Sequence, residues 1–263
     1  MRLAVLIPAF NAQDDLPRTL ASLESDTVPF DIVVVDDGSE PPLQAPDAAG
    51  PHRIVLIRLP QNRGVAQALN VGASWVLEHG FDYLARLDAG DINAPGRLSR
   101  QLAFLEERPE IAVVGAWTRH LDERLRPLYV TRYPESWEGI LRCFHYRTAF
   151  SHVACTIRAS VLRRTGIYDE RCRLAEDYDL FWRVATRFPC ANIPEVLVTR
   201  VESSGSLTHR NRFAMARARL VLQWRHFAWS RLDCWLGVGR SLVLLLVPPA
   251  LALTLKRAAG TVG

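Results

Sequence analysis

The most constraining feature of the sequence is a regular alternation of short apolar runs and amphipathic segments through residues 1–117. Residues 2–10 (RLAVLIPAF) form a continuous apolar run ended by Pro8 and Asn11, which is typical of a strand buried on both faces. Further strands are predicted at residues 30–36, 53–59, 82–87 and 111–117, and helices at residues 14–25, 64–79 and 95–107. We therefore expect an α/β fold in which helices flank a mostly parallel sheet with right-handed crossovers.

Residues 82–95 (DYLARLDAGDINAP) place two carboxylates directly after one of these strands. The short apolar run leads into Asp88 and Asp91, which lie in a turn marked by Gly and Pro. Sheets of this class bind ligands in the crevice at the carboxyl ends of their strands. The segment is therefore the first place where we expect chemistry.

The second half of the chain is less regular, but it contains another cluster of acids. We expect helices at residues 134–144, 159–164 and 176–188, and strands at residues 152–157 and 193–201. Glu176, Asp177 and Asp179 fall in the first turn of one helix, where negative charge suits the helix dipole. This helix start is the second candidate for chemistry.

Several function classes lack their sequence signals. No GxGxxG follows the first strand and no GxxxxGK[ST] occurs, so neither a dinucleotide cofactor nor a P-loop triphosphate is favoured. No zinc-finger, RNP-like or helix-turn-helix pattern supports a nucleic-acid partner. The five cysteines are scattered without CxxC spacing, and residues 1–2 lead straight into a strand. These features favour a reducing cytosol, with each cysteine a small buried hydrophobe.

Carboxylates gathered in one crevice repel one another, so they need a compensating partner. Asp37, Asp88, Asp91 and Asp177 are the acids expected to meet at this edge of the sheet. Oxygen ligands favour hard cations such as Mg²⁺ or Mn²⁺, which bridge diphosphates readily. A substrate that carries a diphosphate follows as a hypothesis.

Five segments, in order and spacing, resemble glycosyltransferase family 2. They read IPAFNAQDDL, VVVDDGS, QNRGVAQALNVG, ARLDAGDINAPGRLSRQLAFL and LAEDYDLFWRV, and the resemblance covers residues 1–205. Each segment alone is a weak signal, whereas five in sequence are specific. The resemblance implies a GT-A fold and inverting transfer of a sugar from a nucleotide diphosphate donor to an acceptor hydroxyl.

The resemblance also implies roles for individual residues. The nucleotide-sugar site would use residues of the first half of the chain. Pro8, Ala9 and Phe10 would surround the nucleoside, and Asp37 would contact the base. Residues 62–70, with Gly64 and Asn70, would lie beneath the ribose and diphosphate, and Asp88 would be the first acid of the DxD motif. Asp177 resembles the general base of the family, and Glu176 would orient the acceptor or the neighbouring backbone. His152 matches a histidine often seen where donor and acceptor meet.

The sequence departs from the family pattern at Gly90. The family usually has Asp-Ala-Asp-Asp where this chain has Asp-Ala-Gly-Asp, and the missing second acid is the expected metal ligand. Three outcomes are open: Asp91 takes the metal, Asp88 and water suffice, or the enzyme depends little on metal. The sequence interpretation favours weak binding of Mg²⁺ or Mn²⁺ by Asp88 and Asp91, because Mg²⁺ commonly keeps several waters and can use one carboxylate plus phosphates.

The C-terminal segment is basic and apolar. Residues 200–263 carry a net charge of +8, which leaves about −4 on residues 1–199. Phe213, Leu220, Trp224 and Phe227 fall on one helical stripe flanked by arginines, which is typical of a helix lying in a membrane interface. The apolar run 241–255 is shorter than the ~20 residues of a spanning helix. We expect a peripheral or monotopic protein at the cytoplasmic face of the membrane, attracted by anionic lipid, although packing on the catalytic domain or on another subunit is the alternative.

The predicted organisation is a catalytic domain, residues 1–205, followed by a helical tail, residues 206–263. Within the domain, residues 1–117 would hold the nucleotide sugar and residues 118–205 the acceptor and the base. The family resemblance makes a lipid-linked or cell-surface saccharide the expected acceptor. The alternative function is a non-catalytic relative that binds a sugar nucleotide or a partner, although retention of Asp88 and Asp177 favours an enzyme. For His152 a satisfied core histidine is an equally good interpretation.

Overall fold

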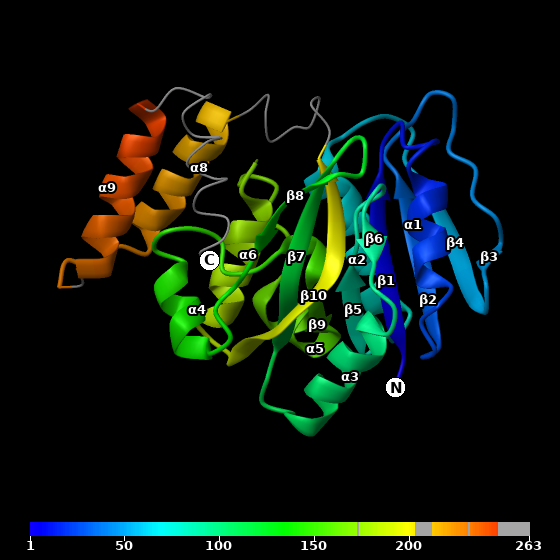
Figure 1. The fold of residues 1–263 in the computed structure, drawn as a ribbon, viewed down its shortest axis with the longest axis horizontal. Coiled ribbons are helices and arrows are strands. Elements are labelled where there is room, and N and C mark those ends of the chain that lie inside the picture. Colours follow the sequence, from blue (N-terminus) through cyan, green and yellow to red (C-terminus); the bar gives the residue numbers. More distant parts are fainter. Residues whose placement is uncertain (173, 203–211, 231, 247–263) are drawn as a thin grey trace.

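The first half of the chain builds four adjacent parallel strands of one sheet (Figure 1). The computed structural model describes residues 1–172, 174–202, 212–230 and 232–246. The elements of this half are β1 (Leu3–Ala9), α1 (Leu16–Leu23), β2 (Phe30–Asp36), β3 (Ala48–Ala49), β4 (His52–Arg58), α2 (Val65–Glu78), β5 (Tyr83–Arg86), β6 (Ile92–Asn93) and α3 (Arg97–Glu107). Strands β4, β2, β1 and β5 lie side by side in that order and run parallel.

The second half extends the same sheet. Its elements are β7 (Val113–Asp122), β8 (Pro127–Thr131), α4 (Trp137–Cys143), the 3-10 helix η1 (His152–Ala154), β9 (Thr156–Arg158), α5 (Ala159–Thr165), α6 (Glu176–Ala185) and β10 (Cys190–Glu202). Strand β9 lies antiparallel between β5 and β7, β10 is parallel to β7, and β6 is antiparallel to β10. The predicted α/β fold with a mostly parallel sheet flanked by helices is confirmed.

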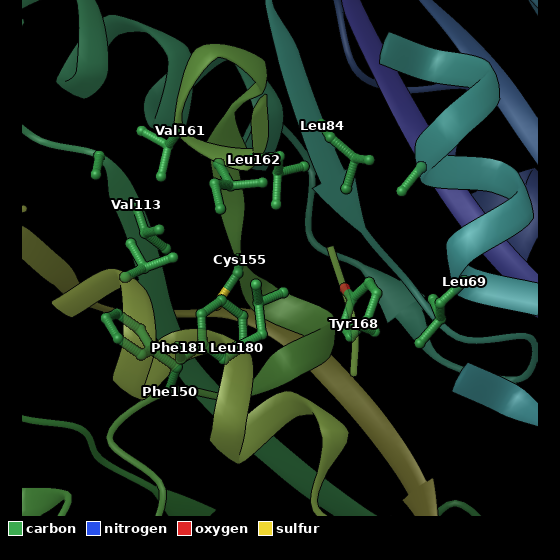
Figure 2. Close-up of a cluster of buried hydrophobic side chains, with 14 of the residues drawn as sticks. Leu69, Leu84, Val113, Phe150, Cys155, Val161, Leu162, Tyr168, Leu180 and Phe181 are labelled. Atoms are coloured by element: carbon green, nitrogen blue, oxygen red, sulfur yellow. The ribbon is translucent and has the colours of Figure 1, made fainter. Parts of the chain in front are cut away.

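Two hydrophobic cores cover the two faces of the sheet. Alternate residues of β1 enter opposite cores, with Leu6 on one face and Val5 and Ile7 on the other, because side chains alternate along a strand. Helices α1 and α3 cover the second face, and α2, α4, α5 and α6 cover the first, part of which Figure 2 shows. Helix α2 approaches closely at Gly72, where a Cβ would lie 2.1 Å from Leu6 Cδ1.

Several local predictions differ from the structure. Residues 152–157 were expected as one strand, but η1 takes their first half and only β9 is extended. Strands β6 and β8 have no apolar alternation of their own and were not predicted. The carbonyls of Ala154 and Cys155 accept hydrogen bonds from Gln101 Nε2 and from the backbone N–H of Arg86. These partners come from distant elements, so a local pattern does not encode them.

The C-terminal helices α8 (Arg212–Arg225) and α9 (Leu232–Leu246) form a hairpin at one end of the molecule, beside α4 and α6 (Figure 1). Gln223 Nε2 donates to the carbonyl of His145 at 2.6 Å, and Ser241 Oγ donates to Gln223 Oε1 at 2.8 Å. The helix that carries the predicted apolar stripe, from Phe213 to Phe227, is shorter than expected, because α8 ends before Phe227. Most of the apolar run 241–255 lies outside the described residues. None of the helices in the described ranges has the length and hydropathy needed to cross a membrane.

Candidate active site

The carboxyl ends of β1, β2 and β5 meet at one edge of the sheet. Ala9 pairs with Asp36 across β1 and β2, and the backbone N–H of Asp37 donates to Ala9 O at 2.8 Å. Leu6 pairs with Arg86 across β1 and β5, so β5 ends three residues before β1 at the same edge of the sheet. Phe10 follows β1 with 48% of its surface exposed. The structure therefore brings the predicted nucleoside residues, 8–10, between the acids that follow β2 and β5.

Asp37 closes the loop that leads into α2. Its side chain is 3% exposed, and its two oxygens accept the backbone N–H groups of Arg63 and Gly64, both at 2.8 Å. Gly64 has φ +93°, and a Cβ there would meet nothing within 4 Å, so the backbone conformation is what requires glycine. Asp37 thus orders the start of α2, while its predicted contact with a base stays a prediction.

Asn70 and His152 belong to one chain of contacts. The Asn70 amide bonds both backbone groups of Tyr168, donating to its carbonyl at 2.9 Å and accepting from its N–H at 3.0 Å. The Tyr168 hydroxyl lies 2.8 Å from His152 Nε2. Asn70 therefore holds the loop that carries Tyr168, and its predicted place beneath a ribose or diphosphate stays a prediction.

Arg86 lies at the centre of the site and was missed in the sequence, although a lone arginine in an otherwise apolar strand is a usable signal. Its side chain is 2% exposed, and Nη1 donates to the carbonyls of Leu6 and Leu87 at 2.7 and 2.8 Å. Nε donates to His152 Nε2 at 3.2 Å and Nη2 donates to Asp88 Oδ1. Because Nε2 accepts from a guanidinium, His152 is neutral, and burial together with Arg86 lowers its pKa well below the ordinary value.

The turn that carries Asp88 and Asp91 is held by α1. The backbone N–H of Asp91 donates to Asp88 O at 3.1 Å, and Gly90 between them has φ +98°. The Thr19 hydroxyl accepts from Gly90 N at 2.8 Å and donates to Asp91 O at 2.9 Å. A Cβ at Gly90 would lie 3.4 Å from Arg18 Nη2 on α1. Position 90 therefore faces α1.

Arg200 of β10 approaches both acids of this turn. Its Nε lies 3.4 Å from Asp91 Oδ2 and its Nη2 lies 4.0 Å from Asp88 Oδ2. Burial raises the pKa of Asp91 to about 7, although Arg200 acts in the opposite direction. Burial also raises the pKa of Asp88, but the charges of Arg86 and Arg200 outweigh it and hold this pKa below the ordinary value.

The residues present do not fit the Mg²⁺ or Mn²⁺ site predicted from the sequence. One oxygen of Asp88 is bonded by Arg86, Asp91 faces the Arg200 guanidinium, and Gly90 supplies no side-chain ligand. Coordination by Asp88 and Asp91 therefore stays a prediction that this geometry does not support. Among the described residues, the one group of three such donors close enough to share an ion is Asp169, Cys172 and Asp179, none of them a predicted ligand.

Glu176 and Asp177, the predicted acceptor-side residues, begin α6. Burial raises the pKa of Asp177, while the backbone N–H of Tyr178, bonded to Oδ1 at 2.7 Å, and the Arg219 guanidinium lower it. Burial and the charge of Asp177 also raise the pKa of Glu176. Arg200 interacts electrostatically with Asp177 as well as with Asp88. The sequence-predicted base and the acids after β5 thus share one cation.

The arrangement has the elements of a group-transfer site, and comparisons with known proteins agree. The model of the family described as "Glycosyl transferase family 2" matches residues 4–171. An uncharacterized glycosyltransferase of Haemophilus influenzae is 32% identical over 174 residues, which cover 65% of this chain and 61% of that protein's length. The amylovoran biosynthesis glycosyltransferase AmsE of Erwinia amylovora is 29% identical over 80% of this chain and 79% of its own length.

A solved structure shows the same architecture. The mannosyltransferase PcManGT of Pyrobaculum calidifontis, in complex with GDP-Man and Mn²⁺, superposes with a TM-score of 0.60 at 18% identity, covering 98% of this chain and 79% of that one. At this identity the likeness concerns the fold, which is that of the GT-A glycosyltransferases. Since the family model spans most of the chain, and the ordered strand ends carry its motif residues, the protein belongs to glycosyl transferase family 2.

Proposed function

We propose that this glycosyltransferase moves a sugar, with inversion, from a nucleotide diphosphate donor to an acceptor hydroxyl, with Asp177 as the general base. The observation that carries the proposal is the partly shielded Asp177 carboxyl at the start of α6, whose pKa is raised by burial. It shares two electrostatic partners with Asp88, namely Arg200 and Tyr168. The shared partners support the proposal, since a single displacement needs the base and the donor-side acid at one site.

In the proposed step the acceptor oxygen attacks the anomeric carbon while its proton passes to the Asp177 carboxylate. The bond from that carbon to the diphosphate oxygen breaks, and the diphosphate leaves with the electron pair. Glu176 would orient the acceptor. His152 remains neutral and holds Arg86, which in turn positions Asp88.

On the donor side, residues 1–117 would bind the nucleotide sugar and residues 118–205 the acceptor. Pro8, Ala9 and Phe10 would line the nucleoside pocket and Asp37 would reach the base, while Gly64 and Asn70 belong to the segment beneath the ribose and diphosphate. The proposal is supported by the likeness to PcManGT, whose structure contains GDP-Man and Mn²⁺. Divalent metals are common among GT-A enzymes, but the proposed displacement uses residues of this chain alone.

The test is release of nucleoside diphosphate across UDP-, GDP- and dTDP-sugars, with and without saccharide acceptors, for wild type and Asp177→Asn. We expect the variant to lose about 10²- to 10⁴-fold in turnover and to bind the donor within threefold of wild type. Asp31→Asn, at the amino end of β2 and so at the opposite edge of the sheet, is the control and should keep full turnover.

A loss of donor affinity equal to the loss of turnover would contradict the assignment of the base. Donor binding without turnover in the wild type, under every acceptor, would favour the alternative function, a non-catalytic relative that binds a sugar nucleotide.

We further propose that the α8–α9 hairpin lies on an anionic membrane surface at the cytoplasmic face, where a lipid-linked saccharide precursor would be the acceptor. Nine of the fifteen exposed large apolar side chains in the described residues belong to this hairpin: Phe213, Val221, Trp224, Trp229, Leu232, Trp235, Leu236, Leu242 and Val243. Arg217, Arg225 and Arg240 are exposed on the same hairpin. Exposed tryptophans beside arginines suit the interface of an anionic bilayer.

The membrane proposal is tested by flotation with vesicles of phosphatidylglycerol and phosphatidylcholine. We expect wild type to float with the vesicles. The double variant Trp224→Ala and Trp229→Ala should bind the vesicles at least about tenfold more weakly, because each substitution removes an exposed aromatic anchor. Leu56→Ala, an exposed apolar change on β4, should leave flotation unchanged. Equal flotation of all three proteins, or none by wild type, would reject the membrane proposal, and a dimer in sedimentation would favour a second copy as the occupant.

A further inference from the structure

The fold itself brings Arg200 to the acids after β5. Strands β6 and β10 are antiparallel, with Asn93 opposite Val198 and Ile92 opposite Thr199. The same register, continued by one residue, sets Asp91 opposite Arg200. The pairing of the guanidinium with Asp91, at 3.4 Å, therefore follows from the backbone ladder.

The two acids already have two cations. Arg86 is 2% exposed and pairs with Asp88, and Arg200 lies between Asp88 and Asp91. A divalent ion held by the same two carboxylates would have to displace Arg200 or lie against it, and like charges at that distance repel. Gly90 offers no ligand to offset this cost. The two carboxyl groups thus have two guanidinium partners within the protein.

The two arginines differ in what they can still bind. Arg86 donates from Nη1, Nε and Nη2 to protein acceptors. Arg200 keeps 41% of its side chain exposed, and its contacts with the two carboxylates, at 3.4 and 4.0 Å, are longer than the hydrogen bonds of Arg86. Its planar fork of N–H donors thus remains for a ligand, and such a fork matches phosphate oxygens.

We propose that sugar transfer by this protein needs no divalent metal, and that the Arg200 guanidinium binds the donor diphosphate and offsets the charge that develops on it as it leaves. The inference rests on the proposed function, since it assigns a residue to the same site. In the step the diphosphate oxygen takes the electron pair of the broken glycosidic bond, and Arg200 donates hydrogen bonds to the phosphate oxygens. Arg86 fixes Asp88 and is a positioning residue.

The first test does not depend on turnover. Binding of UDP, GDP and dTDP is measured by calorimetry in EDTA and in Mn²⁺, for wild type, Arg200→Ala and Arg200→Lys. We expect one nucleotide to bind wild type equally well in both conditions, Arg200→Ala to lose about ten- to hundredfold in affinity, and Arg200→Lys to lose less. The control is Arg100→Ala, which removes an exposed ion pair to Glu195 of the same strand and should bind as wild type does.

The second test is donor turnover in EDTA and in Mn²⁺. We expect EDTA to leave wild-type turnover within twofold and Arg200→Ala to lower kcat by about 10²- to 10³-fold. A rise of tenfold or more in wild-type affinity or turnover with Mn²⁺ would overturn the inference, and so would unchanged nucleotide binding in Arg200→Ala. Either result would leave the proposed function standing, whereas failure of every nucleotide to bind in both conditions would overturn the two together.

Discussion

Gly90→Asp restores the acid that the family pattern has at this position, and the structure predicts a loss of stability without a metal site. Gly90 has φ +98°, a conformation that side chains rarely adopt, which costs about 1–3 kcal/mol for a residue with a Cβ. The nearest atoms to that Cβ are Arg18 Nη2 at 3.4 Å and Asp15 Cγ at 3.5 Å, so no clash adds to the cost. The new carboxylate would join the exposed Asp15–Arg18 pair, where charge contributes less than about 1 kcal/mol.

The expected free energy of unfolding therefore falls by about 1–3 kcal/mol, measured from the urea midpoint with an unchanged slope. For a chain of 263 residues this corresponds to a fall of roughly 2–6 °C in Tm. Gly90→Ala is the matched control, because it shares the backbone cost and adds no charge. An Asp variant as stable as wild type, or one in which Mn²⁺ raises nucleotide affinity tenfold, would refute the reasoning, since the new side chain should point toward α1.

Two further predictions concern pH and the docking of α9. Because burial raises the pKa of Asp177, the acid limb of the pH profile of kcat should lie above the ordinary pKa of an aspartate. The folded state also retains the Asp177 proton to higher pH than the unfolded state does. In urea unfolding, Asp177→Asn should therefore be at least as stable as wild type at pH 8 and should lose this advantage near pH 4. An acid limb of kcat at the ordinary pKa of an aspartate would contradict the inference that burial raises the pKa of Asp177. Gly237→Ala should cost about 1–3 kcal/mol, because its Cβ would lie 1.8 Å from the carbonyl of His145, whereas Gly239→Ala, with nothing within 4 Å, should be neutral or stabilising by up to about 1 kcal/mol. Equal urea midpoints for the two variants would show that α9 does not dock as described.

The regular part of the fold was predictable because each signal is local. Strand β2 has the predicted bounds, since a parallel strand buried on both faces is a continuous apolar run between turn residues. Helix α6 begins at Glu176 as expected, with its acids in the first turn. Strands β6 and β8 were not predicted, because their positions depend on pairing with β10 and β7 and not on their own composition.

The candidate site was predictable in its acids and not in its cations. Asp88 and Asp177 follow recognisable strand and helix boundaries, and the motif order identified them. Arg86 is hidden in an apolar strand, and Arg200 lies in a segment without any motif. The sequence left two interpretations of His152, a residue of the site or a core histidine. In the structure its Nε2 makes hydrogen bonds with Arg86 Nε and with the Tyr168 hydroxyl.

By itself the sequence determined the α/β class, the family and the edge of the sheet where its acids gather, because periodicity, strand ends and motif order are properties of short segments. Only the tertiary structure decided how those acids are compensated. The pairing of Arg200 with Asp91 arises from the register of β10 against β6, and that of Arg86 with His152 from the insertion of β9 between β5 and β7. Such contacts join segments far apart in the chain, and their geometry exists only once the sheet has formed.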